Sequence, residues 1–156
     1  MKKKTDITAG GNMLSYALIM LLAGIGIPIL AAMNASLGKH LNSPVAASAF
    51  AFFIAFCIAL LALLLNDKSF LKEISTAPKH LFFAGTFIAF YVLSITFVAP
   101  HFGVGNAIFF VLLGQMLSAA IIDHYGLFSA QVNQLSLMRF TGILFMVFGI
   151  WLTQKA

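Results

Sequence analysis

Charged side chains are scarce in this chain of 156 residues, of which only 8% are Asp, Glu, Lys or Arg. Soluble globular domains carry about 25% charged residues, and about 45–50% of their residues are apolar. Here 62% of the residues are hydrophobic and the mean hydropathy is +1.03, so the chain has too few polar side chains to cover one compact core. The composition excludes an ordinary soluble domain and indicates an integral membrane protein.

Cysteine and catalytic signatures are also missing. Cys57 is the only cysteine, so no intrachain disulfide can form, and its apolar surroundings favour a small buried side chain. The sequence contains no HExxH pair, no glycine-rich phosphate loop and no nucleophile with a neighbouring base inside an apolar run. We therefore expect no enzymatic activity. The net charge of +5 does not indicate nucleic-acid binding, because the lysines stand in short connectors beside apolar runs, where they orient helices.

Long apolar runs are what the sequence does have. A hydrocarbon core about 30 Å thick needs roughly 20 apolar residues in a helix. A cleaved signal peptide is the minor alternative for the first run, which is too long for that role and precedes four others. The sequence predicts an all-helical transmembrane domain (13–152) between a cytoplasmic N-terminal tail (1–12) and a C-terminal tail (153–156). Its five predicted spans are residues 13–37, 45–65, 81–99, 104–122 and, shortest, 137–152.

The basic residues are distributed unevenly between the two sides of the membrane. With five spans, the N-terminus and the second and fourth connectors share one side, and the positive-inside rule places that side in the cytoplasm. The C-terminus is then outside, unless the short fifth run fails to cross. The same topology separates His40 and His101 from His80 and His124, so we expect no metal site and no cofactor. The predicted cytoplasmic set is Lys2, Lys3, Lys4, Lys68, Lys72, Lys79 and Arg139, against Lys39 and Lys155 outside.

Small residues recur at helical spacing inside several spans. Membrane helices associate through such residues, because lipid gives them no hydrophobic reason to meet. Packing within one subunit is the simpler interpretation, and a subunit interface is the alternative. The helix-packing candidates are Ala47, Ala51, Ala55 and Ala59 in the second span, and Gly142 and Gly149 in the fifth.

One amide interrupts the fourth span. Gln115 and Ser118 are three residues apart and so share a helix face beside Gly114. An unpaired amide costs several kcal/mol in hydrocarbon by rough transfer estimates. These residues either line a polar cavity or form an interhelical hydrogen bond worth about 0.6–2 kcal/mol, and both interpretations stay open.

Two further polar features are ambiguous in the same way. Pro28 removes a backbone donor from the first span ahead of Asn34, which gives either a plain kink or a broken helix that exposes backbone groups to a substrate. Asp123 and His124 close the fourth span. Such a pair can exchange protons, but two solvated groups at a helix end are the simpler interpretation.

Four longer motifs stand out along the chain: NASLGKH (34–40), APHFGVG (99–105), LLGQMLSAAIIDHYGLF (112–128) and RFTGILFMVFGIWL (139–152). Together they resemble the YdcZ-type family of small bacterial inner-membrane proteins, in the drug/metabolite transporter (DMT) superfamily. The resemblance implies a multi-pass protein of the cytoplasmic (inner) membrane with five helices, which is half of a ten-helix inverted-repeat transporter. It also implies export of a small solute. By the same resemblance, Gln115 and Gly114 face a central cavity, Asp123, His124 and Gly126 form the characteristic helix end, and Asn34 belongs to the first-span motif.

The chain departs from the family pattern at Leu30, where the family often has Gln. This departure weakens a polar site shared between the first and fourth spans. The chain also lacks the embedded acid of the four-helix small multidrug exporters, so their proton exchange does not carry over.

The function expected from the sequence is transport by an inverted dimer that works by alternating access. The partner is a second copy or an oppositely oriented homologue. The charge asymmetry predicts a single orientation, so an inverted pair needs either a separately encoded, oppositely oriented homologue or insertion of this chain in both orientations. The alternative is a non-transporting accessory subunit that packs on another membrane complex through the alanine stripe. No acidic or basic side chain embedded in the membrane indicates a cationic or anionic substrate, so the sequence slightly favours a neutral or weakly polar solute.

Overall fold

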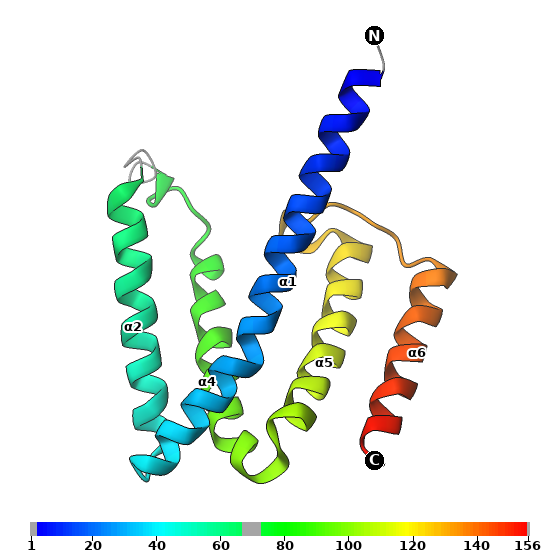
Figure 1. Ribbon diagram of the computed structural model, residues 1–156. Coiled ribbons are helices and arrows are strands. Elements are labelled where there is room, and N and C mark those ends of the chain that lie inside the picture. Colours follow the sequence, from blue (N-terminus) through cyan, green and yellow to red (C-terminus); the bar gives the residue numbers. More distant parts are fainter. Residues whose placement is uncertain (1–2, 67–72, 156) are drawn as a thin grey trace. The chain divides into compact units, whose positions relative to one another are not determined.

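The computed structural model of the protein describes residues 3–66 and 73–155. All regular structure in these two segments is helical, which confirms the all-helical prediction for them (Figure 1). Lys2, Lys68 and Lys72, which carry part of the predicted charge asymmetry, lie outside the described residues. The α-helices are α1 (Lys3–His40), α2 (Pro44–Leu65), α4 (Ala84–Phe102), α5 (Val104–Tyr125) and α6 (Leu137–Thr153), and the 3-10 segments are η1 (Lys79–Phe83) and η2 (Leu127–Ser129).

Four of the helical segments are long and apolar enough to cross a membrane, by length and composition. The helix α6 is apolar but has only 17 residues, so its crossing stays a prediction. The helix α1 begins at Lys3 and ends at His40, beyond both ends of the first predicted span. The four long segments are Met13–His40, Pro44–Leu65, Lys79–Phe102 and Val104–Tyr125.

The helix ends follow from local chemistry. Ser43 caps α2, since its hydroxyl accepts a hydrogen bond from the backbone N–H of Ala46 at 3.1 Å, and Pro44 occupies the first helical position. Gly126 ends α5 in the left-handed conformation, with φ of 62°. A Cβ at Gly126 would lie 2.7 Å from Cγ2 of Val132, so both the backbone and the neighbouring side chain require glycine here.

The first compact unit of the chain contains α1, α2 and α4 as far as His101. Its core is made of small residues, and the closest approach is at Gly38 of α1. A Cβ added to Gly38 would lie 3.2 Å from Cα of Pro44 and 3.5 Å from Cγ2 of Thr96, so the backbones meet where a side chain is absent. The buried residues are Ala31, Asn34, Ala35 and Gly38 on α1, Ala47 and Ser48 on α2, and Val92, Ile95, Thr96 and Ala99 on α4.

The second unit runs from Phe102 to the C-terminus and pairs α5 with α6. The two helices are antiparallel, because polar contacts join them at both ends. At one end the side-chain amide of Gln154 donates to Oδ1 of Asn106 at 2.9 Å. At the other end Nη2 of Arg139 lies 2.7 Å from Oδ2 of Asp123.

Most large hydrophobic side chains are exposed when the chain is taken alone. In the most hydrophobic window of each long helix, between 6% and 17% of the residues are buried. A water-soluble fold could not tolerate this exposure, whereas helices surrounded by lipid tails can. The outer faces of the helices are therefore available to lipid or to other membrane helices.

Candidate functional site

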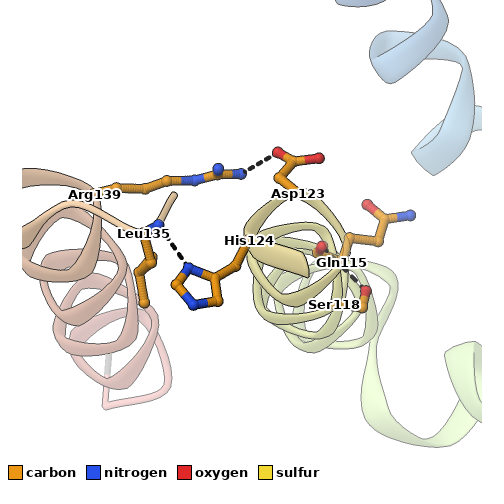
Figure 2. A network of polar contacts seen from close by, with 6 residues as sticks. All are labelled: Gln115, Ser118, Asp123, His124, Leu135 and Arg139. Atoms are coloured by element: carbon orange, nitrogen blue, oxygen red, sulfur yellow. Dashed lines mark hydrogen bonds and ion pairs between the residues drawn. The ribbon is translucent and has the colours of Figure 1, made fainter. Parts of the chain in front are cut away.

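Gln115 lies within α5 and is exposed. Figure 2 shows Gln115 and Ser118 on the side of α5 away from α6. The Ser118 hydroxyl donates within its own helix, to the carbonyl oxygens of Gly114 at 2.9 Å and of Gln115 at 3.2 Å. The Gln115 side chain, by contrast, makes no hydrogen bond to any residue that the structure describes.

The unpaired Gln115 amide lies in a helix apolar enough to cross a membrane, so it needs a partner from outside the second unit. Leaving it to hydrocarbon costs several kcal/mol by rough transfer estimates. A Cβ added at Gly114, one residue earlier, would meet no described atom within 4 Å, so the helix surface beside Gln115 is open. This face of α5 can therefore accept water, a solute or another helix.

Asn34 has a different environment, in the first unit. Its side-chain amide donates to the Thr96 hydroxyl, which in turn donates to the carbonyl oxygen of Val92 at 2.7 Å. Asn34 is 6% exposed and Thr96 is fully buried, so this pair joins α1 to α4 inside the core. Thr96 was not predicted from the sequence as a partner of Asn34. The only sequence feature that points to Thr96 is a hydroxyl side chain on the face of the third predicted span that also carries Val92 and Ala99.

Pro28 lies inside α1, and the helix continues through it to His40. Proline has no N–H, so the carbonyl of Gly24, one turn earlier, lacks its usual donor. A Cβ at Gly24 would also meet no described atom within 4 Å, so this stretch of α1 has an open surface. Leu30, two residues after the proline, is 39% exposed.

Asp123 and His124 are fixed by contacts at the end of α5 (Figure 2). Asp123 pairs with Arg139, and the two side chains are 34% and 24% exposed. The backbone N–H of Leu135 donates to Nδ1 of His124 at 3.0 Å. The sequence predicted a solvated helix end or a proton acceptor for this pair and did not predict Arg139 as a partner. The available signal was the opposite charge at the start of the next span.

The predicted packing residues differ in their surroundings. Ala47 is buried and Ala51 is half-buried, whereas Ala55 and Ala59 are exposed. Cβ atoms at Gly142 and Gly149 would meet no described atom within 4 Å. The contribution of these outer positions to packing stays a prediction. Among the side chains that the structure describes, no group of three or more His, Cys, Asp or Glu could hold a metal ion.

A protein-family model with the description "Putative inner membrane exporter, YdcZ" matches residues 15–152, which is most of the chain. Among curated proteins and among solved structures, none matches this chain. The matched region includes α5, α6 and the connector between them. The chain therefore belongs to the YdcZ family of the DMT superfamily, a family of inner-membrane proteins described as exporters.

Proposed function

We propose that this protein exports a small solute across the inner membrane, as one half of an inverted pair that works by alternating access. The family description supports export and, being that of a transporter, favours a non-enzymatic role. The observation that carries the proposal is the exposed, unpaired Gln115 amide within an apolar helix. A neutral or weakly polar solute can form hydrogen bonds with both the N–H and the C=O of such an amide.

A pair of subunits is needed because a single chain has too few helices to enclose a pathway. Transporters commonly solve this problem with inverted repeats that place the substrate site between two halves. The open helix surfaces at Gly114, Gly142 and Gly149 leave room for a second set of helices. We propose that Gln115, Ser118 and Gly114 line the pathway between the two halves.

The experiment is a thermal-shift screen of neutral and weakly polar solutes on purified protein in lipid, followed by efflux assays with each solute that binds. Gln115→Leu should weaken binding and export by up to about tenfold, because one lost hydrogen bond is worth up to about 1.5 kcal/mol. Gln134→Leu is the matched control, since it removes an exposed amide from the connector instead. If Gln115→Leu folds and still binds and exports the solute like the wild type, the proposed pathway is wrong.

The alternative is a non-transporting accessory subunit that packs on another membrane complex. The exposed Ala55 and Ala59, one helical turn apart on α2, favour it. In that case Ala55→Leu and Ala59→Leu should release the chain from its complex, and Gln115→Leu should have no effect on binding any solute.

A further inference from the structure

The connector between α5 and α6 (residues 126–136) is attached to the end of α5 by several polar contacts. The backbone N–H of Asn133 donates to the carbonyl oxygen of Asp123 at 2.8 Å. The backbone N–H of Leu135 donates to Nδ1 of His124 at 3.0 Å, and Arg139 pairs with the Asp123 carboxylate just beyond the connector. Figure 2 shows the His124 ring directed toward Leu135 of the connector and the Asp123 carboxylate toward Arg139 of α6.

We propose that the His124 contact is pH-sensitive: the neutral imidazole holds the end of the connector, at Leu135, against α5, and protonation breaks this hydrogen bond. A backbone N–H can only donate, so Nδ1 must be an unprotonated acceptor for the contact with Leu135 to exist. Once Nδ1 carries a proton, two donors face each other and the hydrogen bond is lost. Histidine is the side chain whose charge ordinarily changes between pH 5 and 8. The contacts of Asn133 and Arg139 with Asp123 do not involve the imidazole and remain.

Two elements place charged or titratable groups beside His124. On α5 these groups are Asp123 and Tyr125, whose ring lies edge-on to the imidazole with 4.7 Å between centroids. On α6 the group is Arg139, whose Nη2 lies 2.7 Å from Oδ2 of Asp123. The connector itself contains no titratable side chain. Whichever of these groups the imidazolium then meets, protonation breaks the Leu135 contact, because Nδ1 can no longer accept a hydrogen bond.

Backbone strain in the connector favours its release. Phe128 and Ser129 have φ of 56° and 65°, in the left-handed region that side chains other than glycine rarely adopt. Such a conformation persists only while surrounding contacts hold it. Removing the Leu135 contact leaves fewer groups to hold the strained backbone in place.

The contact also lies in the wall of a cavity between α5 and α6. This cavity has a volume of about 390 Å³. His124 and Leu135 both line it, and its other walls are mainly apolar. Breaking the contact would loosen this part of the wall, and this change would occur whether or not the chain transports a solute. The apolar walls include Leu117, Ile121, Ile143 and Val147.

The test is amide hydrogen exchange, measured by NMR on the full chain in lipid nanodiscs at pH 7.5 and pH 5.0. After correction for intrinsic exchange, protection of the Leu135 amide should fall about tenfold between the two pH values, as expected for one lost hydrogen bond. The Ala107 amide, which donates to the carbonyl of Gly103 at 3.1 Å at the other end of α5, should keep its protection.

His124→Gln replaces the imidazole with an acceptor that does not titrate, so the pH dependence at Leu135 should disappear. His80→Gln is the matched control, in the 3-10 segment η1 of the other unit, and should respond like the wild type. Equal protection of the Leu135 amide at both pH values in the wild-type protein would overturn the proposal, as would a pH response that survives in His124→Gln. The wild-type measurement decides the matter even if the variant fails to fold.

Discussion

Single polar side chains have opposite roles in the two units of this protein. In the first unit, the Asn34 amide and the Thr96 hydroxyl satisfy one another inside a core of small residues. In the second, the Gln115 amide projects from α5 without a partner among the residues described. Buried pairs of the first kind stabilise helix packing, whereas an open amide of the second kind is free to bind something else.

Thr96→Val tests the packing role of the first pair. Valine keeps the shape of threonine but removes the acceptor for the buried Asn34 amide, so the free energy of unfolding should fall by about 1–3 kcal/mol. The measurement is equilibrium unfolding in mixed micelles. Thr86→Val on the same helix is the control, because the Thr86 hydroxyl donates only to the nearby carbonyl of Phe83 and is exposed. Equal effects of the two substitutions would argue against the Asn34–Thr96 pair as a packing contact.

Residue-level prediction from the sequence succeeded where the cause is local. The Gly126 helix end, which the family resemblance implied, is present in the structure, and the Ser43 cap likewise depends only on neighbours a few residues away. The partners of Asn34 and Asp123 are 62 and 16 residues away in the sequence. Hydropathy and spacing carry no information on such pairs until the helices are placed side by side.

At the scale of elements, the α5–α6 pair fixes the depth of the short fifth helix. At 1.5 Å per residue, about 26 Å of α5 separates Asn106 from Asp123, and about 22 Å of α6 separates Arg139 from Gln154. These residues meet in two pairs, one at each end of the helix pair. Because α6 extends alongside α5 for nearly this whole length, we predict that α6 crosses the membrane together with α5.

Cysteine labelling tests the crossing of α6. In a Cys57→Ser background, Gln134→Cys and Lys155→Cys should react with a membrane-impermeant maleimide from opposite sides of the membrane. The background protein alone should not react, because Cys57 is the only cysteine. Labelling of both positions from the same side would mean that α6 does not span the bilayer.

The apolar runs predicted which segments form helices, but they did not predict where each helix begins and ends. By the count of apolar residues, the first predicted span ends before Lys39. The hydrogen-bonded helix continues to His40, because after Pro28 the next proline is Pro44. At its other end, α1 continues into the polar residues near Lys3. Hydropathy measures the segment that suits lipid, and the helix can extend past it into water.

At the scale of the whole molecule, the chain buries little of its own apolar surface. Its packing within each unit relies on small residues and end contacts, so its outer faces need lipid or a partner. The sequence predicted the membrane class from composition alone. It could not identify the partner, because an exposed apolar face looks the same toward lipid and toward another helix.

Reporters fused to each terminus test the predicted topology. One reporter should be active only in the cytoplasm and the other only outside, and we expect the N-terminus inside and the C-terminus outside because of the distribution of basic residues. A single orientation would exclude an inverted homodimer and require an oppositely oriented homologue. Equal signals for both orientations would instead support pairing of identical chains, and both ends on one side would contradict the five-span architecture.

The two polar contacts of the α5–α6 pair, one at each end, are separated by a fixed length of helix. Asn106–Gln154 and Asp123–Arg139 are polar, so each is best placed where the hydrocarbon gives way to headgroups. A thicker bilayer would draw one of these contacts into the lipid tails. Tilting shortens the span of a helix that is too long for the bilayer, but it cannot lengthen one that is too short. The protein should therefore be most stable in bilayers whose hydrophobic thickness matches the spacing of these two contacts, and thicker bilayers should have to thin locally around it.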